Sequence, residues 1–213
     1  MTGRSFALQA QHPAAYLDGD SVVQLDDGAV LSLAHDLRRS ASDDIEFAQA
    51  AFHWVRDEVG HSYDVRDPRV TLTAGEVLRE RVGLCYAKSH LLAALLRVAG
   101  IPTGLCYQRL THGDGYVLHG LVAVYLEGSW HRQDPRGNKE GVTAEFSLTD
   151  ERLAWPIDPT VGEIDYPQLM VSPAASVVNA LRSTSDVLSL YDTGLPTALD
   201  DRDSTAATMP AAE

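Results

Sequence analysis

The sequence predicts an α+β domain, and two patterns in its apolar residues lead to that prediction. Between residues 43 and 99 apolar residues recur at three- and four-residue spacing, as they do on one face of a helix. After residue 104 the period falls to two, which is typical of strands. Helices followed by strands therefore indicate a helical layer packed on a sheet.

Composition supports one soluble domain. A chain of 213 residues buries enough apolar surface to need neither a disulfide nor a metal. Its net charge of −13 repels phosphate backbones and anionic lipids, so we expect no nucleic acid and no membrane as partners. With two cysteines and no apolar run at the N-terminus, a cytoplasmic location is the simplest expectation. No cofactor is expected, and the oligomeric state stays open.

The predicted elements begin with short strands and turns in residues 1–30, where Asp26-Asp27-Gly28 has the composition of a turn. A helix is expected over 43–59, with Gly60 ending it. Thr73-Ala-Gly-Glu76 has the pattern of a capping box and should begin a short helix that ends near Arg81.

A stronger helix is expected over 85–99, ended by Gly100 and Pro102. Three strands should follow at 105–110, 117–126 and 130–133, with turns between them. Ser172-Pro173 is a typical helix start. We place the domain at 1–191 and expect an acidic, disordered tail at 192–213, which has no aromatic residue.

Cys85 is the first candidate functional residue. It stands at the predicted start of a long apolar helix, where the free N–H groups and the positive end of the helix dipole favour the thiolate over the thiol. Cys106 lies among apolar residues of a predicted strand, so a packing role suits it better.

A cysteine nucleophile needs a base and a group that orients the base. His119 lies within the predicted strand 117–126. If Glu127-Gly128 is a two-residue turn, Leu121 lies opposite Asp134, and His119 shares a face with Leu121. His119 and Asp134 are then diagonal neighbours, close enough for a carboxylate–imidazole hydrogen bond.

Three blocks of sequence resemble the core of bacterial transglutaminase-like proteins. They are Gly83-Leu-Cys85 at the head of a helix that ends before Pro102, the strand from His119 to Leu126, and Asp134-Pro-Arg-Gly137. The resemblance covers residues 45–137 and includes relatives that are transglutaminases, peptide N-glycanases and microbial cysteine proteases.

The resemblance implies a papain-like fold and acyl transfer from a peptide or other amide, by hydrolysis or to an amine. Cys85 would be the nucleophile, His119 the general base and acid, and Asp134 the orienting carboxylate. The sequence departs from many relatives at Gly120-Leu121, where they carry Trp after the histidine, and at Tyr86-Ala87, after the cysteine. These departures leave cross-linking of glutamine to lysine without support from the motif.

The rest of the site is open at the level of sequence. The backbone N–H of Cys85 is one donor for an oxyanion, and a second donor is needed. The candidates for it are Tyr63, His61 and Gln108, and Tyr86 and Trp130 are candidates for a pocket wall. Lys88 is expected to be a solvated residue on the helix surface.

Three other functions compete with this prediction. A metal site is disfavoured because neither an HExxH nor a CxxC spacing is present. A non-catalytic binding module with the same fold is the main alternative, although the complete Cys/His/Asp set favours an enzyme. Arylamine N-acetyltransferases use the same triad with a thioester donor, but the Arg-Gly-Gly lead into their cysteine is missing here.

Overall fold

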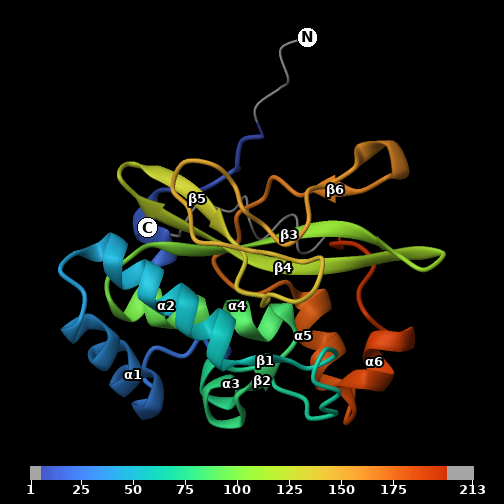
Figure 1. Cartoon of the computed structure of the whole chain (residues 1–213), viewed down its shortest axis with the longest axis horizontal. Helices are drawn as coiled ribbons and strands as arrows, with labels where there is room; N and C mark the ends of the chain where they lie inside the picture. The colour runs from blue at the N-terminus through green and yellow to red at the C-terminus, as the bar shows by residue number, and fades with distance from the viewer. Residues whose placement is uncertain (1–5, 201–213) are drawn as a thin grey trace.

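The computed structural model describes residues 6–200, which fold into a helical layer under an antiparallel sheet, as predicted (Figure 1). The strand order is β5-β4-β3-β6, and neighbouring strands are antiparallel throughout. The four strands are β3 (Thr103–His112), β4 (Gly115–Leu126), β5 (Ser129–Gln133) and β6 (Ile164–Asp165).

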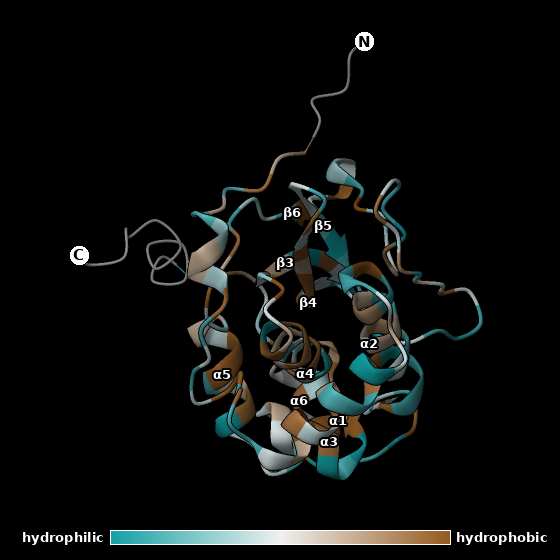
Figure 2. Cartoon of the chain, turned by 90° about the vertical axis from the view of Figure 1, so that its left-hand side faces the viewer, coloured by the Kyte–Doolittle hydropathy of each residue, from teal (hydrophilic) through white to brown (hydrophobic). Residues whose placement is uncertain are grey.

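Helix α4 (Cys85–Val98) lies at the centre of the core, between the sheet and the other helices (Figure 2). Every residue from Cys85 to Arg97 is buried, so α4 has no solvent-facing side. A helix that is buried all round must be apolar on most of its surface, and its row of leucines and alanines meets that requirement. The helix begins at Cys85, the residue predicted to begin it.

Three amphipathic helices cover α4 on the side away from the sheet. They are α1 (Gly28–Arg39), α2 (Asp44–Glu58) and α3 (Ala74–Glu80). The capping box predicted at Thr73 and Glu76 is present at the start of α3. Helix α1 was not predicted, because its N-cap, Asp27, lies in a segment with the composition of a turn. The carboxylate of Asp27 accepts the first free N–H groups of α1 instead.

The β4–β5 hairpin has the register predicted from its two-residue turn. Leu126 lies opposite Ser129, and Val122 opposite Gln133 is the last pair. The turn residues Glu127 and Gly128 both have positive φ, at 50° and 79°, as a type I′ turn requires. The turn fixes which side chains of β4 and β5 share a face of the sheet.

A two-stranded parallel pair was not predicted, because each strand is too short to show a period. It joins β1 (Gly60–His61) to β2 (Val82–Gly83). His61 lies opposite Gly83, and the N–H of Ser62 donates to the carbonyl of Gly83 at 3.2 Å. The pair therefore holds His61 beside the residues that lead into α4.

The two ends of the described chain differ from the predictions. Residues 6–30 contain no strand, but a 3₁₀ helix (Pro13–Tyr16) and an isolated bridge from Gln9 to Gln168. Near the C-terminus, α5 (Ala175–Arg182) begins two residues after the expected proline, and α6 (Val187–Thr193) extends past the expected boundary at 191. Residues 194–200 continue along the domain, and the remainder of the expected tail lies outside the described residues.

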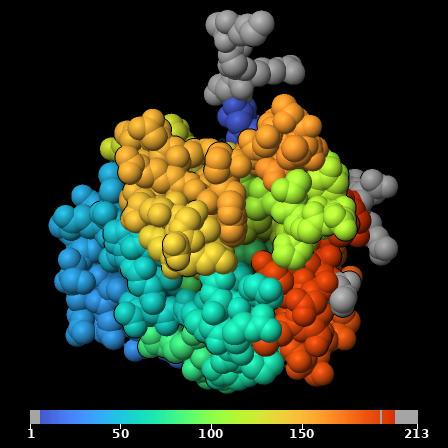
Figure 3. Space-filling model, turned by 45° about the vertical axis from the view of Figure 1, so that its right-hand side comes forward, coloured from blue at the N-terminus to red at the C-terminus, as the bar shows by residue number. Residues whose placement is uncertain are grey.

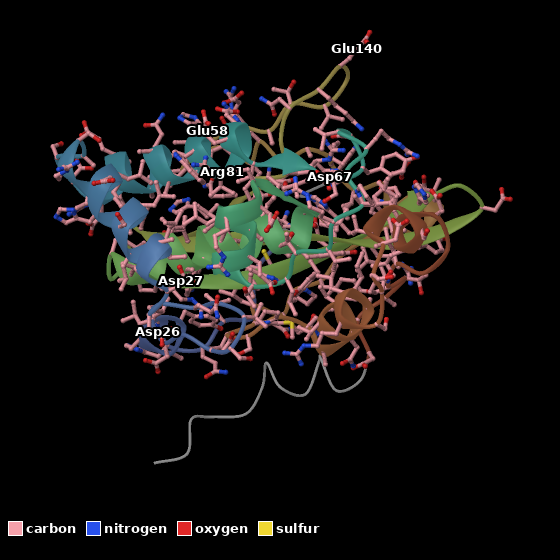
Figure 4. All side chains as sticks on the ribbon, turned by 90° about the horizontal axis from the view of Figure 1, so that it is seen from below. Asp26, Asp27, Glu58, Asp67, Arg81 and Glu140 are labelled. Atoms are coloured by element: carbon pink, nitrogen blue, oxygen red, sulfur yellow. The ribbon has the colours of Figure 1, made fainter. Side chains whose placement is uncertain are left out.

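Charged side chains are distributed over the surface that the helices present in Figure 4. Glu58 at the end of α2 lies 3.9 Å from Arg81, and the carboxylate of Asp27 is 2.9 Å from Arg79. These are exposed or half-exposed pairs, each worth little to stability. None of the helices within residues 6–200 is long and apolar enough to cross a bilayer.

Candidate active site

Cys85 is the first residue of α4 and lies in a cavity of about 370 Å³. The N-cap residue, Leu84, forms no side-chain hydrogen bond with the helix, so the N–H groups of the first turn have no side-chain cap. Cys85 is 7% exposed and lines the cavity.

The end of β5 brings Cys85 and His119 together. Strand β5 stops opposite Val122, so β4 has no partner strand on that side at Gly120. The start of α4 takes this place: the N–H of Gly120 donates to Cys85 Sγ at 3.5 Å, and the hydroxyl of Ser89 donates to the carbonyl of Gly120 at 3.2 Å. His119, the residue before Gly120 in β4, lies beside the sulfur.

His119 and Asp134 form a buried hydrogen-bonded pair. Nε2 of the imidazole lies 2.7 Å from Asp134 Oδ2, and the ring also interacts with the Cys85 side chain. Since Nε2 is taken by the carboxylate, Nδ1 is the nitrogen left for the sulfur. Burial lowers the pKa of His119, but the charges of Asp134 and Cys85 outweigh burial and raise it to about 10. The imidazolium is thus favoured at neutral pH.

Asp134 is held as a carboxylate by three contacts. Besides His119, it accepts hydrogen bonds from the backbone N–H groups of Arg136 at 3.1 Å and of Ala154 at 3.0 Å. Burial raises the pKa of Asp134, but the charge of His119 and these hydrogen bonds outweigh burial and lower it. The carboxylate is completely buried.

Sequence reasoning missed Trp155, which covers the imidazole. The indole meets the His119 ring edge to face, with centroids 5.0 Å apart, and Arg136 lies over the same indole at 5.1 Å. Trp155 comes from the loop that follows β5, and its neighbour Ala154 bonds to Asp134. The chain lacks a tryptophan just after the histidine, and this tryptophan from a distant loop contacts the histidine ring instead.

The five accessory candidates separate into two groups. His61 and Tyr86 line the cavity that holds Cys85, and the Tyr86 hydroxyl donates to the carbonyl of Leu118. Tyr63, Gln108 and Trp130 do not line it.

The last three have other partners. Tyr63 stacks on Tyr191, with ring centroids 4.0 Å apart. The Gln108 amide donates to Asp165 at 2.9 Å, across the β3–β6 pair. Trp130 packs against Tyr125 and Tyr16 near the hairpin end of the sheet. The spacing of residues in the sequence could not predict these partners, because it contains no information on contacts between distant segments.

His61 is a buried, neutral imidazole in the wall of the cavity. Burial and the charge of Arg136 lower its pKa to about 3, although Asp64 acts in the opposite direction. Its Nδ1 has no hydrogen-bond partner and lies 3.9 Å from Asp64 Oδ2. Arg136 is itself buried and forms an ion pair with Asp64 at 2.6 Å. His61 therefore offers an uncharged ring with unused hydrogen-bonding capacity.

Lys88 is not the solvated residue that the sequence suggested. Its ammonium group is fully buried and donates to the carbonyls of Val59 and, at 3.1 Å, of Arg56. Burial and the charge of Arg136 lower its pKa to about 7. The position one turn after Cys85 looks like a helix surface in the sequence, but the end of α2 covers it in the fold.

Segments from several parts of the chain form the walls of the cavity and meet on the face shown in Figure 3. Tyr191 of α6 and Leu195 after it line one side, and Pro156 lines another. Burial and the charge of Cys85 raise the pKa of Tyr191 to about 12. Within residues 6–200 no three His, Cys, Asp or Glu side chains are placed to hold a metal ion.

Comparison with known proteins agrees with this architecture. Residues 31–135 match the model of the transglutaminase-like superfamily. Kyphoscoliosis peptidase of Mus musculus is 28% identical over 131 residues, and its human counterpart is 27% identical over the same length. The match covers 54% of this chain but only 20% of each peptidase.

Among solved structures, a protein from Cytophaga hutchinsonii that has been proposed to be a cysteine protease superposes with a TM-score of 0.50 at 20% identity. The match covers 58% of this chain and 41% of that protein. The periplasmic domain of TgpA from Pseudomonas aeruginosa superposes with a TM-score of 0.45 at 22% identity, over 59% of this chain and 48% of that one.

The family match includes both Cys85 and His119 and ends just after Asp134. The fold, with a helix at the centre packed on a curled antiparallel sheet, is shared with the Cytophaga protein. Residues 31–135, about half of the chain, belong to the transglutaminase-like superfamily.

Proposed function

We propose that the protein is a cysteine-dependent enzyme that transfers an acyl group from a peptide or other amide, with Cys85, His119 and Asp134 as its catalytic triad. The observation that carries the proposal is the buried His119–Asp134 pair, 2.7 Å apart, beside a cysteine that opens onto a cavity. Cys85 and His119 line the cavity and the buried Asp134 supports His119 from behind, an arrangement of ionisable groups that is typical of functional sites.

The proposed reaction starts with the thiolate of Cys85 attacking the amide carbonyl. The imidazolium of His119 then donates its proton to the leaving amine, and a thioester remains on Cys85. Water or a second amine next attacks the thioester, and neutral His119 accepts its proton. The sulfur leaves as the thiolate, which releases the acyl group and restores the thiolate–imidazolium pair. Asp134 holds the ring in position and stabilises its charged form.

The tetrahedral intermediate needs donors for its oxyanion. The N–H of Cys85 at the uncapped start of α4 is one. Of the candidates Tyr63, His61 and Gln108, only His61 lines the cavity, so we assign the second donor to it. Its neutral state suits this role, since a neutral imidazole can turn an N–H toward the developing charge without giving up a proton.

Labelling with an electrophile tests the nucleophile. A peptide chloromethyl ketone should modify Cys85 in the wild-type protein, and intact-mass measurement should show no adduct on Cys85→Ala. Cys106 is the internal control, because burial raises its pKa and keeps it a thiol. An adduct that persists in Cys85→Ala contradicts the assignment.

The main alternative is a binding module that keeps the fold without catalysis. Iodoacetamide separates the two, because an activated thiolate reacts faster than an ordinary buried thiol. If Cys85 and Cys106 react equally slowly at about pH 7, the binding module is favoured.

A further inference from the structure

One edge of β4 is open beside the candidate nucleophile. Since β5 ends opposite Val122, the backbone groups that β4 turns toward β5 lack a strand partner at Gly120 and Leu118. These two residues point the same way, because backbone groups of an antiparallel strand alternate between its two neighbours. Leu118 and Gly120 flank His119, so this edge runs through the site.

All four backbone groups on the open edge have partners in the structure. At Gly120 these are Cys85 Sγ and the hydroxyl of Ser89, and at the carbonyl of Leu118 the hydroxyl of Tyr86. The N–H of Leu118 donates to the carbonyl of Pro196 at 2.7 Å. Three of the four partners belong to α4, and the fourth comes from the far end of the chain.

Residues 194–200 are here called the C-terminal segment, and this segment contacts the edge of β4 through the carbonyl of Pro196. Leu195, which precedes Pro196, is half-buried and lines the same cavity as Cys85 and His119. A carbonyl of the segment pairs with the strand edge, and a neighbouring apolar side chain lies in the cavity. An extended peptide that adds to a sheet edge makes these same two kinds of contact.

The spacing of residues along a strand gives the separation between the Pro196 carbonyl and the sulfur of Cys85. Leu118 and Gly120 are two residues apart, which is about 7 Å along a strand. An extended peptide whose carbonyl replaces that of Pro196 therefore has a second carbonyl, two residues along, at the level of Gly120. The sulfur of Cys85 lies there, 3.5 Å from the Gly120 nitrogen.

We propose that the open edge of β4 binds an extended peptide substrate, and that the C-terminal segment occupies its place when no substrate is bound. The substrate pairs with Leu118, puts a bulky apolar side chain where Leu195 lies, and presents to Cys85 the carbonyl two residues after the one that pairs with Leu118. This inference rests on the proposed function and names the class of substrate.

The walls of the cavity support an apolar side chain. Beside the catalytic groups they consist largely of apolar residues, namely Leu84, Leu110, Val117, Leu118, Trp155 and Pro156. An apolar side chain gains free energy by leaving water for such a surface, whereas a charged one loses its hydration without a partner. The charged side chains of Arg136 and Glu163 also line the cavity, and both already have partners. Arg136 is paired with Asp64, and Glu163 accepts hydrogen bonds from Thr111.

The test uses the full chain and a set of peptide chloromethyl ketones, acetyl-Xaa-Ala-Ala-Gly, in which only Xaa changes. The reactive carbonyl belongs to the glycine, two residues after the alanine that takes the place of Pro196. Inactivation of Cys85 should be at least about tenfold more efficient with leucine at Xaa than with aspartate or lysine, a factor that corresponds to roughly 1.4 kcal/mol. Equal inactivation by all members of the set contradicts the apolar position.

Two variants test whether the C-terminal segment competes with the probe for the edge of β4. Leu195→Ala should lower the inhibition constant of the leucine probe, because the segment then holds the edge less tightly. Leu199→Ala is the matched control, since Leu199 packs on the core but does not line the cavity. A higher or unchanged inhibition constant in Leu195→Ala shows that the segment is a fixed wall and overturns the proposal.

A synthetic peptide of residues 192–200 gives an independent measurement. It should protect Cys85 of Leu195→Ala from the leucine probe, and the same peptide with aspartate in place of leucine at 195 should not. Alkylation by iodoacetamide should be equal in wild type and Leu199→Ala, because Leu199 does not line the cavity.

Failure of the two proposals can be told apart. If iodoacetamide modifies Cys85 no faster than Cys106, the proposed enzyme function fails. The edge is then judged by amide NMR, in which the leucine peptide must shift the Leu118 and Gly120 signals if it binds there. If Cys85 is activated but those signals do not shift, the edge proposal alone fails.

Discussion

The backbone N–H of Gly120 points at the sulfur of Cys85 from 3.5 Å, which places the helix start directly against the strand that carries His119. A side chain at Gly120 has no room there. A Cβ built on it lies 2.8 Å from Tyr86 Cδ1 and 3.2 Å from Tyr86 Cα. The close approach of α4 to β4 therefore depends on glycine at this position.

Gly120→Ala should lose most activity and about 1–3 kcal/mol of stability, because the added methyl group pushes the start of α4 away from the strand. Gly115→Ala is the matched control in the same strand, since a Cβ there meets nothing within 4 Å. Urea denaturation and the rate of Cys85 labelling check both variants. Equal behaviour of the two contradicts the packing argument.

Asp134→Asn should lower turnover by about 10²–10⁴-fold while keeping the fold, because the amide preserves the size of the carboxylate but not its charge. The pKa of His119, now about 10, should fall, since Asp134 is the largest favourable charge acting on it. The pH profile of iodoacetamide alkylation shows the change. An unchanged profile indicates that Asp134 does not act through His119.

His61→Phe should lower turnover by about 10²–10³-fold, the cost of losing one oxyanion donor. A peptide aldehyde, which forms a tetrahedral adduct with the thiol, should bind His61→Phe less tightly by a similar factor. Simple alkylation by iodoacetamide should be unaffected, because it forms no oxyanion. His61→Gln keeps an N–H donor and should recover part of the aldehyde affinity. Loss of alkylation in His61→Phe instead points to a structural role.

Lys88 and His119 act on stability in opposite directions as pH rises. The folded-state pKa of His119, about 10, is above its ordinary value of 6.5, so its stabilisation is complete below 6.5 and is lost as pH rises through 10. The folded-state pKa of Lys88, about 7, is below its ordinary value of 10.5, so its cost is complete below 7 and is relieved as pH rises toward 10.5. Between about pH 7 and 10 the two effects offset each other.

Lys88→Met should expose the effect of His119. Relative to wild type, the free energy of unfolding of Lys88→Met should fall by about 1.4 kcal/mol for each pH unit between about pH 7 and 10. The reason is that the titration of Lys88 no longer offsets that of His119. Urea denaturation at about pH 7, 8 and 9 measures the slope. Lys139→Met, which removes a half-exposed lysine, is the control and should leave the slope unchanged. Parallel slopes for wild type and Lys88→Met contradict the buried, neutral lysine.

Short stretches of the sequence were enough to predict the central part of the candidate site. The helix start at Cys85 follows from the apolar run behind it, and the pairing of Leu126 with Ser129 follows from a two-residue turn. Because strand side chains alternate, that turn puts His119 and Asp134 on one face, and they lie 2.7 Å apart. Each of these relationships spans few residues, so period and turn geometry suffice to predict it.

Tertiary structure decided everything that depends on distant segments. Trp155 reaches His119 from a loop, His61 is held by a four-residue sheet too short to show a period, and Tyr191 enters from α6. Lys88 is buried only because α2 ends over it. The pattern of apolar residues predicts which side chains share a face of a helix or strand, but not which other segment covers that face. Burial depends on packing between elements that are far apart in the chain.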